Sequence, residues 1–448
     1  MLNRIFRLLQ RSLLVAVLPG FGLSYAQQVE LSGLPDYPSQ PVSEATWTRT
    51  AENMRWMSRN FSVKPSLILS RGEKLYEIPA NFPGGPGLGD FEFIVPGNNL
   101  PLTLREVLEQ AEVDAFLVLK ADELIYEQYF NGFDAHTHHS WFSGAKSLLG
   151  MAVGILVEEG RLDVGKSPAD YISELRESAY AGVTLQQVLN MTTALAYTSD
   201  PEAMNPGHLR HEYLKRGGML PAFDIYLQTL EPSEENVPRG VRAVSTLVTA
   251  STSVDPGKSF DYQNINVDVL GWVIERASGQ PLSEFLRDRV WRKLQTEHDA
   301  IMPTDPNYTA LAAGGLSSTA RDAARFGLSV VNGGLLGKAK IFPQAWIEST
   351  CRYNQADEQS FFDRRKTAAD FSAFGSVQAY RNYWYIHDRG ECAMATRGFG
   401  GQSIYINRAR GVVIVTFASA LAEDREGNNA LMYVTHQLAS RISSIAAD

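Results

Sequence analysis

The tetrapeptide Ser-Gly-Ala-Lys at positions 143–146 opens the segment that decides the fold of this 448-residue chain. From Ser143 to Glu159 the apolar side chains recur at helical spacing, and Gly160 follows as a typical helix end. Ser143 and Lys146 stand three positions apart, so a helix brings the amino group within reach of the hydroxyl. A lysine kept neutral by burial can accept the serine proton and make the oxygen nucleophilic. The S-x-x-K pattern therefore predicts Ser143 as a nucleophile and Lys146 as its activating base.

The segments around this helix predict a sheet. Four runs rich in β-branched and aromatic residues predict two hairpins, 115–120 with 123–130 and 403–407 with 412–417. Between the hairpins, residues from about 160 to 300 show helical patterns, and a further helix is expected from about 429 to 443. This order of strands and helices predicts an α+β domain, in which an antiparallel sheet is flanked by helices and carries a mostly helical inserted part.

The first 26 residues have the pattern of a secretory signal. Arg4, Arg7 and Arg11 precede a short apolar stretch, and residues 24–26, Ser-Tyr-Ala, fit a small-x-small cleavage site. The apolar stretch is shorter than the roughly 20 residues that a membrane helix needs, although an uncleaved anchor is the alternative interpretation. The expected location is the periplasm or the outside of the cell, with no stable membrane span after cleavage.

After removal of residues 1–26, we expect an extension rich in Pro and Gly over 27–100 and a catalytic domain over 101–448. The sequence has 41 Lys and Arg against 50 Asp and Glu, a net charge of −9, and loss of the three signal arginines leaves −12. This acidic balance argues against nucleic acid as a partner, because phosphate backbones are bound by basic faces. The two cysteines, Cys351 and Cys392, exclude a disulfide framework, and they are either paired or two free buried thiols.

Tyr262 and Asn264 form a second candidate element, just before an apolar helix expected over 267–277. A tyrosine beside a lysine can share its proton and act as a phenolate base or a proton relay. The Asn264 amide can orient the lysine or a substrate amide. Tyr380 and Asn382 have the same Tyr-x-Asn spacing, but their neighbours are typical of a strand, so Tyr262 is preferred.

A glycine-rich loop precedes the expected strand at 403–407. Its residues 396–402 read Thr-Arg-Gly-Phe-Gly-Gly-Gln, and glycines at the start of a strand let the backbone approach a ligand closely. A backbone N–H in this loop can complete an oxyanion hole with the N–H of Ser143 at its helix N-terminus. A simple glycine bulge is the alternative interpretation.

Three histidines, His136, His138 and His139, stand just before the candidate nucleophile and suggest a metal site. The H-x-H-H pattern lacks the acidic ligand and the later histidines of metallo-hydrolases, so a solvated loop is expected instead. His208 and His211 lack the glutamate of an H-E-x-x-H site. We therefore expect neither a metal site nor a cofactor.

Taken together, these elements resemble the serine β-lactamase and penicillin-binding superfamily, which carries the S-x-x-K signature. The Tyr-x-Asn element is similar to that of the class C branch, and within this branch the chain most resembles 6-aminohexanoate-dimer hydrolases and related esterases. The resemblance covers about residues 100 to 440, and the stretches that support it are 152–162, 189–193, 314–322 and 398–402.

The resemblance implies a serine β-lactamase-like fold and a role for each matching residue. Ser143 would be the acylated nucleophile, Lys146 its activating partner and Tyr262 the base and acid. Asn264 would orient the reacting groups, and the oxyanion hole would consist of the N–H groups of Ser143 and Phe399. The reaction would form an acyl-enzyme and then hydrolyse it with water.

The third motif departs from the pattern of the superfamily. Penicillin-recognising members carry Lys-Thr-Gly or His-x-Gly where this chain has Thr396, Arg397 and Gly398. Arg397 can still bind a carboxylate, but its displaced cation argues against turnover of β-lactams. Tyr197 would be a cleft residue by its position in the resemblance, with a plain loop aromatic as the alternative.

The function expected from these observations is that of an exported serine hydrolase. It would cleave amide or ester bonds of a small-molecule substrate through an acyl-enzyme on Ser143. The first alternative is a β-lactamase or D-Ala-D-Ala peptidase. The second is a non-catalytic binding module that kept the fold. The acyl group, the leaving group and the oligomeric state are left open.

Overall fold

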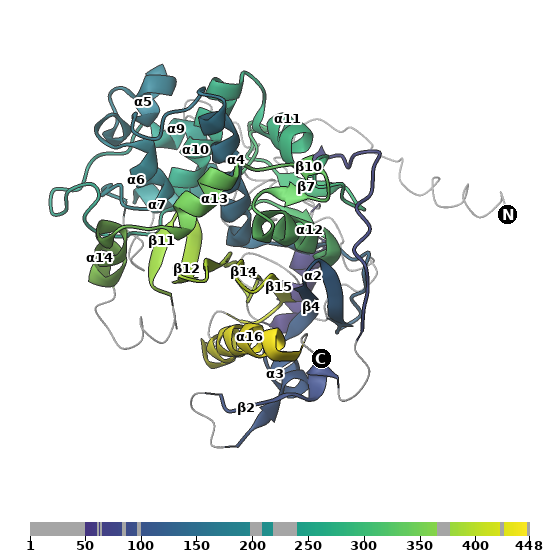
Figure 1. The fold of residues 1–448 in the computed structure, drawn as a ribbon. Coiled ribbons are helices and arrows are strands. Elements are labelled where there is room, and N and C mark those ends of the chain that lie inside the picture. Colours follow the sequence, from purple (N-terminus) through teal and green to yellow (C-terminus); the bar gives the residue numbers. More distant parts are fainter. Residues whose placement is uncertain are drawn as a thin grey trace, which may run out of the picture.

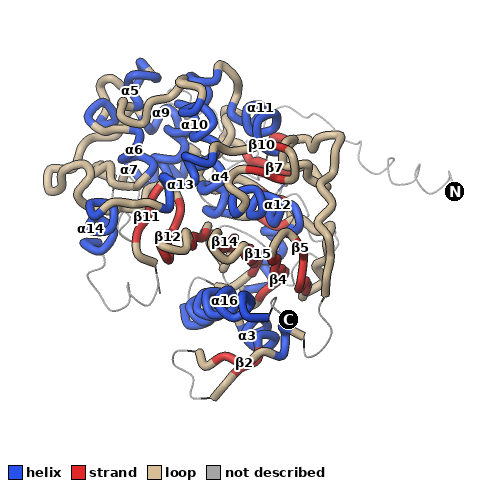
Figure 2. The backbone as a smooth tube through the Cα atoms, viewed as in Figure 1, coloured by secondary structure: helices blue, strands red, loops and turns tan. Residues whose placement is uncertain are grey.

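A seven-stranded antiparallel sheet forms the centre of the molecule, with helices on both of its faces (Figures 1 and 2). The structure is a computed structural model that describes residues 50–60, 62, 65–82, 87–95, 100–197, 208–217, 240–364, 377–421 and 425–445. In sheet order the strands are β11 (Ala379–Arg381), β12 (Trp384–Asp388), β13 (Ala393–Ala395), β14 (Ser403–Asn407), β15 (Val412–Ala418), β4 (Val113–Lys120) and β5 (Glu123–Tyr129). The two predicted hairpins are present, and β15 of one pairs with β4 of the other.

The central strands divide their side chains between two hydrophobic cores. In β4, Leu117 and Leu119 belong to one core, whereas Phe116 and Val118 belong to the core on the opposite face. The first face is covered by α12 (Ala320–Val331), and the second by α3 (Leu104–Gln110) and α16 (Arg425–Ile445). Burial on both faces explains why the central strands are almost continuously apolar.

The chain between β5 and β11 carries most of the described helices, α12 among them, in agreement with the helical patterns predicted for this part of the sequence. Its helices are α4 (Ala145–Glu158), α5 (Pro168–Tyr171), α6 (Leu185–Leu189), α7 (Leu209–Arg216), α9 (Val241–Ser245), α10 (Asn264–Ser278), α11 (Leu282–Leu286), α13 (Gln344–Cys351) and α14 (Gln355–Arg364). Single turns lie at η5 (Ser173–Leu175), η6 (Ala179–Gly182) and η9 (Arg287–Trp291). Helix α10 contacts α4, α5, α6, α9 and α11, so it forms the centre of this helical part (Figure 1). It ends, as predicted, at Gly279, whose φ of 72° is left-handed.

A smaller sheet connects the N-terminal residues to the segment that leads to Ser143. Its strands, in order, are β1 (Ser66–Leu69), β7 (Ala300–Pro303), β8 (Ser317–Ser318) and β6 (His139–Ser140). The remaining elements are α2 (Ala51–Arg59), η3 (Leu88–Asp90), η4 (Phe142–Gly144) and the two-stranded pairs β2 (Glu92–Phe93) with β3 (Leu102–Thr103) and β9 (Leu335–Leu336) with β10 (Ala339–Lys340). Residues of the expected extension thus contribute a strand to a sheet, whereas the expected signal segment lies outside the described residues.

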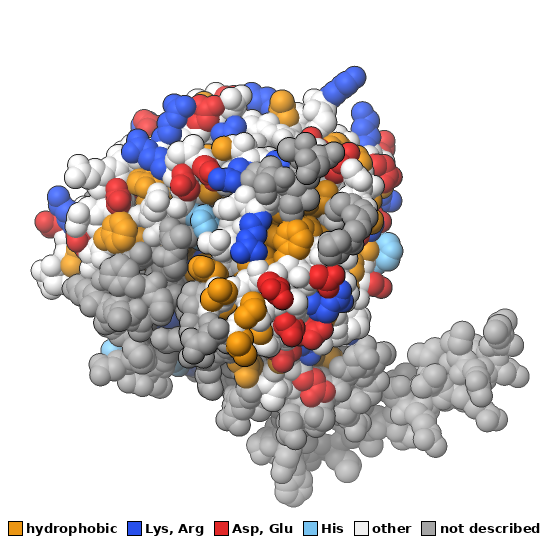
Figure 3. Space-filling model, turned by 60° about the horizontal axis from the view of Figure 1, so that its bottom comes forward, with side chains coloured by type: hydrophobic (Ala, Val, Ile, Leu, Met, Phe, Trp, Pro, Cys, Tyr) orange, Lys and Arg blue, Asp and Glu red, His pale blue; other side chains and the backbone are white. Residues whose placement is uncertain are grey.

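A disulfide joins Cys351, at the end of α13, to Cys392, with 5.2 Å between the Cα atoms. It links the helical part to the turn before β13, and it decides between the two states that the sequence left open for these cysteines. Among the helices of the described ranges, none combines the length and the apolar character needed to cross a membrane. On the face turned forward in Figure 3, basic and acidic side chains of the described residues lie intermixed.

Candidate active site

Ser143 lies in a tight turn between β6 and α4. The preceding residue, Phe142, has a φ of +45°, which is a left-handed conformation that bulky residues rarely adopt. Its N–H donates to Ser140 Oγ at 3.1 Å, and the buried Trp141 donates through Nε1 to Ser318 Oγ at 2.9 Å. Helix α4 begins at Ala145 rather than at the predicted Ser143, because this turn comes first. Strain of this kind is typical of positions that present a functional side chain.

Lys146 reaches Ser143 from the first turn of α4. Its Nζ donates to Ser143 Oγ at 2.9 Å and to the carbonyl oxygen of Ala313. The lysine is 1% exposed, and burial lowers its pKa to about 7, against the opposing charge of Asp268. An amine with this pKa is partly neutral at physiological pH, so it can accept a proton from the serine.

Asp268 of α10 is a residue of this centre that the sequence analysis did not single out. Its Oδ1 accepts the N–H groups of Ala312, at 2.8 Å, and Ala313, at 3.2 Å, and its Oδ2 accepts the Tyr213 hydroxyl. Burial raises the pKa of Asp268 to about 6, although these hydrogen bonds and the Lys146 charge act in the opposite direction. The carboxyl group thereby holds the 312–313 backbone, whose carbonyl binds Lys146. In the sequence, this role was indicated by one feature, an acidic residue within the apolar stretch of a predicted helix.

Tyr262 lies next to Lys146, just before α10. Its ring centroid is 5.1 Å from Lys146 Nζ, and its side chain hydrogen-bonds Ser143. Burial raises the pKa of Tyr262 well above its ordinary value, and nearby Tyr385 adds to this, while the Ser143 hydrogen bond lowers it. Tyr262 therefore keeps its proton near neutral pH, which favours a proton donor over the phenolate base that the sequence also allowed.

The competing Tyr-x-Asn pattern occupies a structural position. Tyr380 in β11 packs behind Tyr262, with 6.5 Å between the ring centroids. Arg381 forms an ion pair with Asp357 at 2.6 Å, and Asn382 donates through Nδ2 to Thr350 Oγ1 at 2.8 Å. These polar partners bind the segment to α13 and α14. The structure thus brings Tyr262, and not Tyr380, to Ser143.

The glycine-rich loop lies against the turn that carries Ser143. A Cβ atom on Gly398 would overlap the carbonyl oxygen of Trp141, so only glycine permits this approach. The rings of Phe142 and Phe399 meet edge to face, with 6.0 Å between centroids. The buried Gln402, whose role the sequence did not reveal, donates to Phe399 O at 2.9 Å and fixes the loop.

Three further predicted residues differ in their surroundings. Asn264 is the first residue of α10, and the described hydrogen bonds of Lys146 do not include it. Its Oδ1 is buried without a hydrogen-bond partner among the described residues. The Arg397 guanidinium lies 5.5 Å from the Tyr385 ring, and burial lowers its pKa against the opposing effect of that tyrosine. Tyr197 is 3% exposed and packs edge-on against another tyrosine of the core.

The histidines before Ser143 are not one solvated loop, and this prediction was wrong for His139. The His139 ring is fully buried, with Nδ1 2.9 Å from Ser140 O and Nε2 3.3 Å from Asp114 Oδ2. Its partner lies on β4, which explains why local sequence spacing did not reveal the contact. His136 is exposed and His138 is half-buried.

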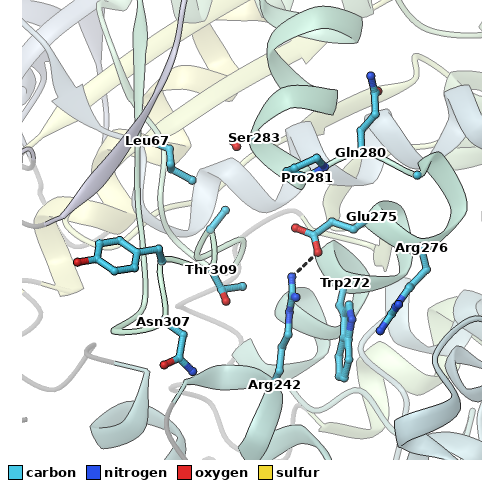
Figure 4. Close-up of a pocket in the computed structure, with 13 residues that line it drawn as sticks. Leu67, Arg242, Trp272, Glu275, Arg276, Gln280, Pro281, Ser283, Asn307 and Thr309 are labelled. Atoms are coloured by element: carbon cyan, nitrogen blue, oxygen red, sulfur yellow. Dashed lines mark hydrogen bonds and ion pairs between the residues drawn. The ribbon is translucent and has the colours of Figure 1, made fainter.

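A groove of about 620 Å³ lies elsewhere, between α9, α10 and the loop after β7 (Figure 4). Trp272 lies in it between two guanidinium groups, with Arg242 at 5.2 Å and Arg276 at 5.8 Å from its ring centroid. Arg242 is paired with Glu275, and none of the predicted site residues lines this groove. This groove is therefore separate from the candidate active site around Ser143.

Comparison with known proteins identifies the family. Residues 103–438 match the beta-lactamase family. The chain is 29% identical over 387 residues to the 6-aminohexanoate-dimer hydrolase of Paenarthrobacter ureafaciens, which covers 86% of this chain and 90% of that protein. A Bacillus anthracis structure, provisionally named a 6-aminohexanoate-dimer hydrolase, has a TM-score of 0.76 at 24% identity and covers 91% of this chain and 98% of its own.

A more distant structure, EstCE1, is a hydrolase with promiscuous acyltransferase activity. Its TM-score is 0.52 at 12% identity, and the match covers 73% of this chain and 96% of that one. The expected serine β-lactamase-like fold is confirmed by the solved structures. With three quarters of its length matched to one family model, this chain belongs to the beta-lactamase family, and it is a hydrolase of that fold related to 6-aminohexanoate-dimer hydrolase.

Proposed function

We propose that this protein is a serine hydrolase that cleaves amide or ester bonds of small molecules through an acyl-enzyme on Ser143. The observation that carries the proposal is the 2.9 Å contact between Ser143 Oγ and a buried lysine whose pKa is lowered to about 7. A serine hydroxyl needs such a proton acceptor before it can attack a carbonyl. A helix-capping serine beside a surface lysine would show neither the burial nor the contact.

The first chemical step forms the acyl-enzyme. Neutral Lys146 accepts the hydroxyl proton of Ser143, and Oγ attacks the carbonyl carbon of the substrate. The negative charge that develops on the carbonyl oxygen is stabilised by the N–H groups of Ser143 and Phe399. Tyr262 donates its proton to the leaving amine or alkoxide as the bond breaks, and it recovers a proton from the Lys146 ammonium.

The second step releases the acid. Lys146, neutral again, takes a proton from a water molecule that attacks the acyl carbon. As the acyl–Oγ bond breaks, the Lys146 ammonium returns this proton to Ser143, which leaves as the hydroxyl. Asp268 acts on both steps as a positioning residue, because it holds the Ala313 carbonyl that binds Lys146. No group beyond these side chains and water is needed to balance the protons.

The substrate class follows from relatives and from two polar side chains. The curated relative acts on the dimer of 6-aminohexanoate, which is a linear amide with a free carboxylate. In this chain, the unpartnered Oδ1 of Asn264 can accept the N–H of a substrate amide. Arg397, two residues before Phe399, can bind a carboxylate. We therefore propose a small linear amide or ester with a carboxylate end as the preferred substrate.

The proposed function is tested by labelling with a fluorophosphonate probe, followed by intact-protein mass spectrometry. We expect one adduct on the folded wild type and none on the Ser143→Ala variant. Absence of labelling on folded wild type would favour the non-catalytic binding module. Turnover of p-nitrophenyl esters and 6-aminohexanoate dimer, compared with nitrocefin, then separates the proposed activity from that of a β-lactamase.

We further propose that the protein is exported. The arginine-led apolar segment at the N-terminus supports this, and the disulfide between Cys351 and Cys392 is typical of oxidising compartments. Expression of the full chain in a Gram-negative host, followed by fractionation, tests the proposal. A periplasmic protein whose N-terminus begins after Ala26 is the expected result, and an uncleaved cytoplasmic protein would contradict it.

A further inference from the structure

Two histidines and one glutamate from distant parts of the chain converge at the edge of the smaller sheet. His136 Nδ1 lies 3.3 Å from His298 Nε2 and 3.9 Å from Glu297 Oε1. His136 belongs to the loop before β6, and the other two residues directly precede β7. The three potential ligand atoms all lie within 4.8 Å of one another. The acidic ligand that was absent from the local histidine pattern is thus supplied by a remote segment.

We propose that His136, His298 and Glu297 form a binding site for a divalent transition-metal ion, with zinc as the best-fitting ion. Zinc binds imidazole nitrogens at about 2.0 to 2.1 Å in tetrahedral geometry, which separates two such nitrogens by about 3.3 Å. The observed distance between the two histidine nitrogens matches this separation. Two imidazoles and one carboxylate are a ligand set that zinc commonly takes, with water in the fourth position.

The groups behind the ligands support the same site. Asp322 is fully buried, and its Oδ2 lies 3.7 Å from His298 Nδ1, a buried nitrogen without a hydrogen-bond partner in the described structure. The same carboxylate accepts the backbone N–H groups of Glu297, at 2.8 Å, and His298, at 3.1 Å. A carboxylate facing the second imidazole nitrogen keeps the proton there and leaves the Nε2 lone pair for a metal.

Glu297 has one oxygen available for the ion. Its Oε2 faces Arg325, whose Nη2 is 3.7 Å away, while Oε1 faces His136. His138 stands two positions from His136, but its Nε2 lies 2.8 Å from the carbonyl oxygen of Asp299. This contact sets His138 apart from the ligand set and makes it a matched control.

A bound ion would join two strands of one sheet. The loop that carries His136 leads into β6, and the segment that carries His298 leads into β7, while β8 pairs with both strands. The site therefore links the chain just before Ser143 to the strand that pairs with β1. Because the ion binds the folded chain, its binding raises the unfolding temperature.

The proposal is tested on the full chain, purified without a histidine tag and dialysed against EDTA. Zinc is titrated by calorimetry into the wild type and into His136→Gln, His298→Gln, Glu297→Gln and His138→Gln variants. We expect one equivalent of zinc on the wild type and on the His138→Gln variant. Loss of any of the three ligands should weaken binding by at least about tenfold. Cobalt substitution should give the intense visible absorption of a tetrahedral site, which disappears in His136→Gln.

The His136→Gln variant is the most direct test of the ligand set. The His136 side chain is 66% exposed, so we expect its replacement to leave the fold intact. The proposal is overturned if the wild type binds less than one equivalent, or if His136→Gln binds zinc as tightly as the wild type. Equal weakening by His138→Gln would also overturn the ligand assignment. Circular dichroism of each variant shows whether it is folded, so a failed His298→Gln preparation leaves the test intact.

Discussion

Two buried ionisable groups in this protein, Asp114 and Lys146, have opposite surroundings. Asp114 is fully buried on β4, and charged or polar side chains bind it from several elements. These partners are Arg55 at 2.7 Å, Asn131 at 3.1 Å, His139 at 3.3 Å and Ser419. Lys146 is equally buried, but its described hydrogen bonds go to the neutral Ser143 hydroxyl and the Ala313 carbonyl. The same degree of burial is thus combined with two different sets of neighbours.

The difference shows in the pKa of each group. Burial by itself raises the pKa of Asp114, but the hydrogen bond from His139 and the charges of His139 and Arg55 lower it below its ordinary value. Burial lowers the pKa of Lys146 to about 7, and Asp268 offsets this only in part. Asp114 therefore keeps its charge and stabilises the fold, whereas Lys146 can lose its charge and carry protons. The comparison separates a structural centre from a chemical one.

The largest expected effect is on activity, from Lys146→Met. Removal of the proton acceptor should lower kcat/KM for a p-nitrophenyl ester by about 100- to 10,000-fold. The free energy of unfolding at neutral pH should not fall. Burial disfavours the charged form of Lys146 in the folded state, and an apolar methionine side chain does not carry this cost. Steady-state kinetics and urea unfolding on the same preparations measure both quantities. A Lys146→Met variant that unfolds more easily but keeps its activity would show that Lys146 has a structural role rather than a chemical one.

The Asp114→Ala variant should lose stability and keep its activity, the opposite of what is expected for Lys146→Met. It leaves Arg55 and His139 without their carboxylate, so the free energy of unfolding should fall by about 3 to 5 kcal/mol. Activity per folded molecule should stay close to that of the wild type, because none of the described hydrogen bonds of Asp114 goes to Ser143, Lys146 or Tyr262. Urea unfolding at neutral pH gives the first quantity, and active-site titration gives the second. A large loss of kcat in folded protein would show that Asp114 belongs to the chemical centre.

Tyr262→Phe sharpens the assignment of the proton donor. Loss of this hydroxyl should lower kcat by at least about 100-fold, because no proton reaches the leaving group. Tyr380→Phe is the matched control, since this ring packs against Tyr262 but lies behind it. The control should keep kcat near the wild-type value. Equal effects of the two substitutions would remove the special role of Tyr262.

The smallest effect is expected from Asp268→Asn. Asparagine can still accept the N–H groups of Ala312 and Ala313, so the backbone that binds Lys146 is retained. Loss of the negative charge removes an influence that raises the Lys146 pKa, so the acid limb of the activity profile should move to lower pH. The shift should be about one pH unit or less. A shift to higher pH would contradict this sign.

Local patterns in the sequence predicted the hairpins, the helix after Ser143, and the candidates Lys146 and Tyr262. These predictions rest on side-chain periodicity and on residues a few positions apart, which the backbone geometry of helices and strands fixes. Long-range partners were not predictable in this way. Asp268 holds a backbone N–H 45 positions away, and His136 meets His298 across 162 positions.

Burial was the second property that the sequence did not reveal. His139 was expected in solvent, and the structure instead buries it against Asp114, 25 positions earlier. The lowered pKa of Lys146 likewise depends on elements that close over it after folding. A motif can therefore point to a candidate reacting group, whereas the protonation state of that group depends on the packed structure.

The measurement that tests the central claim most directly is the pH dependence of Ser143 acylation. The second-order rate constant for a fluorophosphonate probe should be followed from two pH units below to two above the Lys146 pKa of about 7. Protonated Lys146 cannot accept the serine proton, so the rate should fall about tenfold per pH unit below the inflection. Asp114 stays ionised in this range because its pKa is lowered, so circular dichroism should not change. A rate constant that is independent of pH, or that rises in acid while the protein stays folded, would contradict a neutral lysine as the base.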